Sequence, residues 1–129
     1  MGEMFVGNKL TRSIGKNNLE EVQLWLGAGI DPNSTDADGN SAIFLATFTG
    51  NTNIMKELLV KGANANLVKG GKTSALEVAV EKDRIDLVTL LVQYGANPNR
   101  VNRDGHTPLS IAQSRHLDDL VRIMNNEGL

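Results

Sequence analysis

The apolar side chains of the chain fall into short amphipathic runs that recur at a fixed interval. In the stretches VQLWL (22–26), MKELLV (55–60) and VTLLVQ (88–93), apolar residues are spaced as on one face of an α-helix. A glycine follows each run within three positions, and glycine most readily adopts the left-handed conformation at a helix end. The pattern predicts helices that end at glycines, namely Gly29, Gly62 and Gly95.

The interval between these runs is 33 residues, and it also holds for positions outside them. One column of residues 33 apart gathers apolar side chains typical of a core, namely Leu10, Ile43, Leu76 and Leu109. A second column gathers residues whose side-chain oxygen can cap a helix N-terminus, namely Asn8, Ser41, Ser74 and Thr107. Pro108 follows the last of these at the first helical position, where proline is best tolerated. The chain is therefore predicted to contain four copies of one structural unit.

Each predicted unit contains a turn, a short helix, a second turn, a longer helix, a glycine and an extended segment. The units span residues 1–33, 34–66, 67–99 and 100–129. A unit of this length cannot bury its apolar face alone, so stacking on its neighbours must stabilise it. The end units carry polar residues in columns that are apolar elsewhere, as at Glu21 and Asn125. We therefore expect capped ends, one domain over residues 1–129 and a complete protein rather than a fragment.

The repeated unit resembles the ankyrin repeat, whose signature is T-P-L-H-x-A. The best match is DGHTPLSIA (104–112) with YGANPN (94–99) before it, followed by DGNSAIFLA (38–46) and KGANAN (61–66). The resemblance covers the whole chain. It implies an all-α ankyrin-repeat solenoid of four helix-turn-helix repeats that are joined by β-hairpin loops.

Composition narrows the function classes only slightly. The net charge of −2 provides no basic footprint for nucleic acid. The absence of cysteine excludes disulfides and thiolate metal sites. No apolar run approaches a membrane span, and the N-terminal stretch lacks the apolar region of a signal peptide. We expect a cytoplasmic protein, with a removed leader peptide left open.

The tripeptide Gly71-Lys72-Thr73 raises the alternative of a nucleotide-binding P-loop. That loop also needs a glycine five residues earlier, and Asn66 stands there instead. The 33-residue period places the tripeptide at a turn tip, where Lys72 occupies the position of Gly39 and Gly105. We therefore expect an altered hairpin turn rather than a nucleotide site.

Other chemistry finds little support in the residue pattern. His106 and His116 are the only histidines, and a metal site would need at least a third ligand. No G-x-S-x-G or H-E-x-x-H sequence occurs, and no glycine-rich loop joins a strand to a helix. The sequence predicts no catalytic, cofactor or metal site, and an enzyme with an unrecognised site is the rival interpretation.

Two aromatic residues stand in columns of opposite character. Trp25 shares its column with apolar residues and is predicted to pack in the core; its column mates are Leu58, Leu91 and Met124. Phe48 stands in a column expected to be solvated, whose other members are Gly15, Glu81 and Ser114. Phe48 is thus either an exposed interface residue or a ring folded onto a neighbouring repeat.

The ankyrin resemblance implies binding of another protein through the hairpin tips and the concave face formed by the first helices. Phe44 is expected to border that face. The expected partner-binding residues are Ala37, Asp38, Asn40, Phe44, Phe48, Thr49, Gly70, Gly71, Thr73, Glu77, Glu81, Lys82, Arg103, Asp104, His106, Ser110, Ser114 and Arg115. The mixed charges of this face suit a specific protein partner better than a polyanion.

The resemblance leaves the biological role open. A free-standing protein of this kind can act as an inhibitor that blocks its partner's surface. A scaffold or adaptor subunit and a bacterial toxin-neutralising immunity protein are the alternatives. In each case we expect a monomer on its own, with no cofactor, nucleic acid, membrane or small-molecule substrate.

Overall fold

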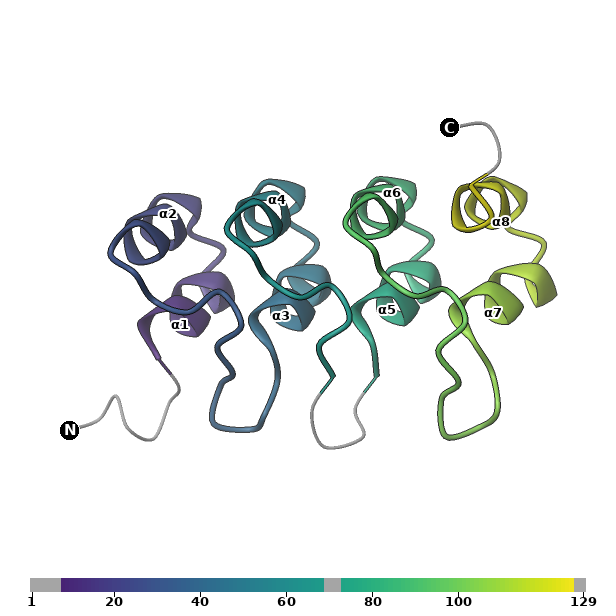
Figure 1. The fold of residues 1–129 in the computed structure, drawn as a ribbon, viewed down its shortest axis with the longest axis horizontal. Helices are drawn as coiled ribbons and strands as arrows, with labels where there is room; N and C mark the ends of the chain where they lie inside the picture. The colour runs from purple at the N-terminus through teal and green to yellow at the C-terminus, as the bar shows by residue number, and fades with distance from the viewer. Residues whose placement is uncertain (1–7, 69–72, 127–129) are drawn as a thin grey trace.

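The chain folds into stacked helix pairs in a computed structural model that describes residues 8–68 and 73–126. These residues form eight α-helices and no strand. The helices are α1 (Lys9–Gly15), α2 (Leu19–Gly27), α3 (Ala42–Thr49), α4 (Thr52–Val60), α5 (Ala75–Glu81), α6 (Ile85–Gln93), α7 (Pro108–Ser114) and α8 (Asp118–Met124). Each predicted unit contains one helix pair, and the four pairs stand side by side in chain order (Figure 1).

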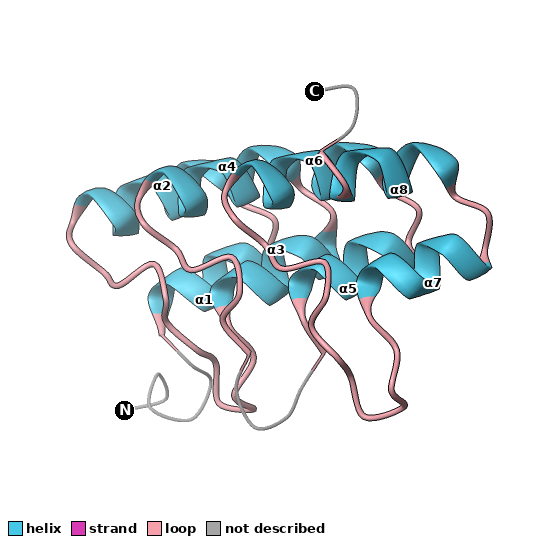
Figure 2. Cartoon of the chain, turned by 45° about the vertical axis from the view of Figure 1, so that its right-hand side comes forward, coloured by secondary structure: helices cyan, strands magenta, loops and turns pink. Residues whose placement is uncertain are grey.

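The helices lie in two layers. The inner layer consists of α1, α3, α5 and α7, and the outer layer of α2, α4, α6 and α8 (Figure 2). Between one pair and the next, the chain leaves the outer helix, runs toward the inner layer and forms a loop beyond it. These hairpin loops project on one side, beyond the N-terminal ends of the inner helices (Figure 2).

Local chemistry explains where the inner helices begin. The Asn8 side chain accepts a hydrogen bond from the backbone N–H of Thr11 at 2.8 Å, and Ser41 and Ser74 make the equivalent bonds at 3.1 Å. Thr107 forms a full capping box with Ser110. These bonds satisfy N–H groups that have no partner inside the helix, so the predicted capping column is confirmed.

Left-handed residues end the outer helices and separate the two helices of each pair. Gly29, Gly62 and Gly95 have φ angles of 97°, 100° and 90°. They lie two residues beyond α2, α4 and α6, where the sequence predicts them. Between inner and outer helices a second left-handed column appears, consisting of Asn17, Gly50, Asp83 and His116.

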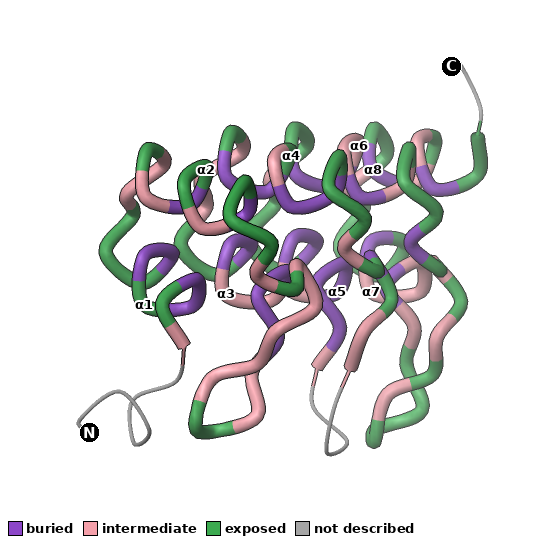
Figure 3. The backbone as a smooth tube through the Cα atoms, turned by 60° about the vertical axis from the view of Figure 1, so that its left-hand side comes forward, coloured by how far each residue is buried: buried purple, intermediate pink, exposed green. Residues whose placement is uncertain are grey.

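The core lies between the two layers and between successive pairs. Leu10, Ile43 and Leu76 are 0%, 2% and 1% exposed, whereas Leu109 in the same column is only half-buried. The first three are covered by the pair that follows each of them, and no further pair covers α7 within the described residues. Stacking therefore completes the burial of each unit, as expected for a repeat protein. Figure 3 shows the buried segments along the helices and the exposed hairpin tips of the second and fourth units.

Asparagine side chains connect the extended segments of successive repeats. The Asn33 Oδ1 atom accepts a hydrogen bond from the backbone N–H of Asn64, and Asn66 Oδ1 accepts one from Asn97, both at 2.7 Å. Asn66 Nδ2 also donates to the carbonyl of Gly95 at 2.8 Å. The 33-residue asparagine column thus provides a ladder of bonds between neighbours.

The predicted β-hairpin loops contain very little β-structure. Among the described residues, only Thr35 and Ser41 form an antiparallel bridge. Backbone and side-chain bonds hold the tip of the second unit together: the Asp36 N–H donates to the carbonyl of Asn40, and Asp36 Oδ1 accepts from the N–H groups of Asp38 and Asn40. The tip of the third unit, with its predicted altered turn at Lys72, lies outside the described residues.

Candidate partner-binding surface

The inner helices leave one face uncovered, which we call the inner-helix surface. In α3 the buried residues are Ala42, Ile43, Ala46 and Thr47. The remaining side chains on the opposite side of the helix include Leu45 and Phe48. The same positions recur in α1, α5 and α7, because the repeats are in register. The inner-helix surface corresponds to the predicted concave face and adjoins the hairpin loops (Figure 2).

Phe48 is exposed on this surface. Its ring is stacked on Phe44, with the ring centroids 6.2 Å apart, and its residue is 61% exposed. The Lys82 ammonium of the next repeat lies 5.1 Å from the centre of the Phe48 ring. An ammonium over an aromatic face is attracted by the ring quadrupole, here without removing the ring from solvent. The ring is thus exposed rather than folded onto a neighbouring repeat, its column mates Gly15, Glu81 and Ser114 are exposed as well, and its role in an interface stays a prediction.

Glu77 is buried, although it is among the expected partner-binding residues. Glu77 is only 7% exposed, and Thr11 in the same column is 4% exposed. The Glu77 Oε2 atom accepts a hydrogen bond from Asn102 Nδ2 at 3.2 Å, while Oε1 is buried and has no hydrogen-bond partner among the described residues. This column points toward the following repeat, so Glu77 connects α5 to the fourth hairpin and is not a free contact residue.

The other predicted contact residues divide by exposure. Those that are exposed are Ala37, Asp38, Phe48, Thr49, Glu81, Lys82, Arg103, Asp104, His106, Ser114 and Arg115. Those that are half-buried are Asn40, Phe44, Thr73 and Ser110. Gly70 and Gly71 lie outside the described residues. Exposure therefore leaves most of the set available to a partner, whereas Glu77 is buried, and the binding role of the set stays a prediction.

Sequence reasoning missed three apolar residues of the inner-helix surface. Leu45, Val78 and Ile111 occupy equivalent positions in α3, α5 and α7, and each is half-buried. Their column begins with Arg12, which is exposed in α1. That arginine does not by itself identify a surface column, because the end units also place polar residues in core columns, as at Asn125.

Trp25 confirms the prediction of core packing only in part. It is half-buried and packs against the core, while Leu58 and Leu91 in its column are fully buried. Those two side chains have a preceding helix pair to cover them, and none precedes α2 within the described residues. One side of the indole is covered instead by the Lys9 ammonium, 4.7 Å from the ring centre.

Arginine side chains join neighbouring repeats along the edge of the inner-helix surface. Arg84 donates to the carbonyl of Gly50 at 3.1 Å, and Arg115 donates to the carbonyl of Glu81 at 3.3 Å. Arg84 also pairs with Asp86 at 2.8 Å. The hydrogen bond from the Arg84 guanidinium lowers the pKa of Asp86, and the same bond raises the pKa of Arg84.

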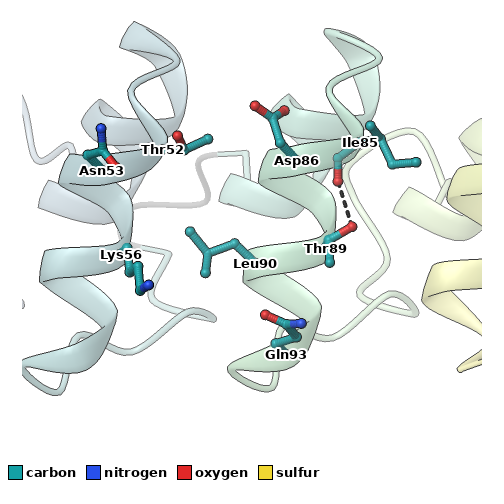
Figure 4. Close-up of a pocket in the computed structure, with 8 residues that line it drawn as sticks. All are labelled: Thr52, Asn53, Lys56, Ile85, Asp86, Thr89, Leu90 and Gln93. Carbon is teal, nitrogen blue, oxygen red and sulfur yellow. Dashed lines mark hydrogen bonds between the residues drawn. The ribbon is translucent and has the colours of Figure 1, made fainter. Parts of the chain in front are cut away.

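The outer layer has a shallow groove of about 340 Å³ between α4 and α6 (Figure 4). Its lining residues are Thr52, Asn53, Lys56, Ile85, Asp86, Thr89, Leu90 and Gln93. None of the predicted contact residues lies in it. The Thr89 hydroxyl donates to the carbonyl of Ile85 at 2.7 Å and is therefore already partnered. The groove contains no histidine or cysteine that could act as a nucleophile or base.

Metal-ligand groups and membrane-spanning helices are absent from the described residues. In residues 8–68 and 73–126, no three His, Cys, Asp or Glu side chains are grouped so that they could hold a metal ion. The helices of this part of the chain have seven to nine residues, and none is long and apolar enough to cross a membrane.

Comparison with known proteins identifies the repeat. A family model described as ankyrin repeats, in three copies, matches residues 10–102. Among solved structures, an ankyrin repeat domain from Acinetobacter baumannii is similar, with 27% sequence identity and a TM-score of 0.83. The match covers 91% of this chain and 62% of that one, so this chain spans less than two thirds of its neighbour's length. No curated protein matches the chain.

Proposed function

Because the chain belongs to the ankyrin-repeat family, we propose that it binds a partner protein through its inner-helix surface and hairpin tips. Ankyrin repeats are generally protein–protein interaction modules. The fold supports this use, since stacking places equivalent side chains of successive repeats next to one another on an extended face. Binding residues on loops and on one helix face can vary without disturbing the core, which lies between the layers.

The exposed Phe48 ring is the observation that carries the proposal. A phenylalanine that is 61% exposed in the second repeat leaves a large apolar area in contact with water. Exposed aromatic rings flanked by polar groups are favoured as hot spots, because a partner that covers them removes that area from solvent. Lys82 of the next repeat lies over the ring, and the neighbouring residue Thr49 and the column mate Glu81 are exposed and polar.

The finer proposal is that binding inhibits the partner. An inhibitor, or an immunity protein that neutralises a toxin, lowers the partner's activity when it covers the working surface. A scaffold or adaptor leaves that activity unchanged. The cysteine-free sequence suits the reducing cytoplasm, where we place the protein as a monomer before binding. An activity assay of the captured partner, with and without this chain, separates the roles.

The proposal is tested with two matched aromatic variants. Phe48→Ala removes an exposed ring from the inner-helix surface, and Tyr94→Ala removes a ring that is 43% exposed at the end of the outer helix α6. Each protein is immobilised and used to capture partners from extract of the native cell, and the affinity for the captured protein is then measured. We expect Phe48→Ala to weaken binding at least ~30-fold, as about 2 kcal/mol implies, and Tyr94→Ala to change it little.

Thermal unfolding accompanies the capture. Because Phe48 is exposed, its truncation should change the free energy of unfolding by no more than about 0.5 kcal/mol. A loss of about 3–5 kcal/mol would indicate that the ring packs in the core after all. Wild-type affinity together with wild-type stability would refute the role of Phe48. The hairpin tips at Asp38 and Asp104 would then be tested next.

A further inference from the structure

Three apolar side chains form a line across the inner-helix surface, which we call the aliphatic stripe. It consists of Leu45 in α3, Val78 in α5 and Ile111 in α7, each 33 residues from the next and each half-buried, with Leu45 and Ile111 also packed in part against the core. Packed helices have axes roughly 8–10 Å apart, so the side chains of the stripe repeat at about that distance. The stripe therefore presents a regular apolar pattern rather than a single pocket.

Two cations lie beside the stripe, about one helical turn beyond its members in α5 and α7, whereas the equivalent position in α3 is Thr49. Lys82 and Arg115 each lie four residues after a member of the stripe, and such residues are neighbours on one helix face. Within the described residues, neither forms an ion pair with a carboxylate: Lys82 lies on the Phe48 ring and Arg115 bonds a backbone carbonyl. Glu81 and Asp83 are exposed on either side of Lys82 in the chain, so two carboxylates also lie near these cations.

From this arrangement we propose that the segment bound on the inner-helix surface is an acidic amphipathic α-helix of the partner protein. It lies across α3, α5 and α7, with apolar residues about every seventh position on the stripe. Its acidic residues, at the same interval, face Lys82 and Arg115. This inference rests on the proposed function and adds the chemistry and conformation of the partner.

The spacing favours a helix over a β-strand. Seven residues of α-helix make nearly two turns and advance about 10.5 Å, which returns a side chain to the same face near the spacing of the stripe. Residues on one face of a strand are about 6.6 Å or 13 Å apart. Neither distance matches the spacing of about 8–10 Å between the side chains of the stripe.

A polyproline II segment also repeats at about 9.3 Å, with three residues per turn. Such a segment leaves its backbone carbonyls without internal partners, and it normally docks in aromatic-lined grooves. The stripe provides aliphatic side chains with no hydrogen-bond donor. A helix satisfies its own backbone groups and needs only the apolar contact and the charge pairs, so the observations favour the helix.

The test is a selection from a displayed library of 22-residue peptides with randomised positions, carried out on the full chain. We expect enriched peptides that are helical when bound, with apolar residues seven apart and acidic residues on one flank. Their affinity should fall at least tenfold for Val78→Asp and for the pair Lys82→Glu with Arg115→Glu. The matched controls are Gln93→Asp and the pair Lys56→Glu with Lys61→Glu, which make the same charge changes on or beside the outer helices.

The outcomes separate the two proposals. Some peptides could depend on Val78 and yet carry prolines at every third position, or show no preference for acidic residues. Either result would overturn the proposed acidic helix and leave the inner-helix surface as the binding site. Peptides indifferent to both Val78→Asp and Phe48→Ala would overturn the surface itself, and a library without enrichment would overturn the helix. Circular dichroism and thermal unfolding verify that each variant is folded, and Val78→Ala replaces Val78→Asp if the latter is not.

Discussion

The second and fourth repeats have the same local design but differ in burial. In the second repeat, Ile43 and Met55 are 2% and 0% exposed, and another helix pair covers them on each side. In the fourth repeat, Leu109 and Val121 occupy the same columns and are half-buried. The position of a residue within the repeat thus determines whether its side chain points inward. The presence of a neighbouring repeat determines how much of that side chain is shielded from solvent.

The largest effect is expected for truncation of equivalent core residues. Ile43→Ala should lower the free energy of unfolding by about 2–5 kcal/mol, since the side chain is almost fully buried and its removal leaves a cavity. Leu109→Ala should cost roughly half as much, because part of its surface is already in water. Urea unfolding followed by circular dichroism measures both. Equal losses would show that the fourth repeat is as well covered as the second.

An intermediate effect is expected for the asparagine ladder. Asn66 bonds both Asn97 and Gly95 of the following repeat, so Asn66→Ala should cost about 0.5–1.5 kcal/mol. The Asn99 side chain makes no hydrogen bond within the described residues, so Asn99→Ala is the matched control and should cost less. Both variants are compared by urea unfolding, and a larger loss for Asn99 would contradict the ladder as a link between repeats.

The smallest effect is expected for the pair between Arg84 and Asp86. The pKa of Asp86 is lowered in the folded state, so the pair stabilises the fold above the unfolded pKa of about 3.9. This contribution is lost as the pH falls through the lower, folded pKa. Both side chains are more than a third exposed, so solvent screening limits the contribution to about 0.5 kcal/mol or less.

The measurement compares Asp86→Asn with the wild type at pH 7 and at pH 2.5. The variant should be slightly less stable at pH 7, and the difference should shrink at low pH. Asp118→Asn is the control in the fourth repeat, because it also removes a first-turn carboxylate but one without an ion pair among the described residues. A difference between Asp86→Asn and the wild type that grows at low pH would contradict the assigned direction of the pKa.

The parts of the fold that could be predicted are those that depend on nearby residues. The caps at Ser41 and Ser74 and the left-handed glycines Gly62 and Gly95 were correctly predicted, because each acts within three or four residues of its position. The asparagines that link successive repeats can be seen in the sequence as a residue repeated every 33 positions. Their hydrogen bonds cannot be inferred from it, because they join residues 31 positions apart.

The candidate surface was only partly predictable. Phe48 was singled out because its column mates are polar or small, and that signal is contained in the sequence. Glu77 is expected on the binding face from the ankyrin resemblance but is buried, and Val78 is not among the expected contact residues. In a stacked helix, a column can instead face the next repeat, and a polar side chain there is buried by its neighbour, as Glu77 is at 7% exposure.

The sequence by itself determined the period, the helix pairs and their turns, because these depend on propensities and caps that operate within a few residues. Only the tertiary structure decided which side chains remain in solvent, because burial requires atoms from another repeat. It placed Lys82 over Phe48 and Asn102 against Glu77, and it left Trp25 half-covered at the first repeat. Contacts between residues 25 or more positions apart depend on how successive repeats are aligned when they stack. The same alignment determines which side chains form the inner-helix surface.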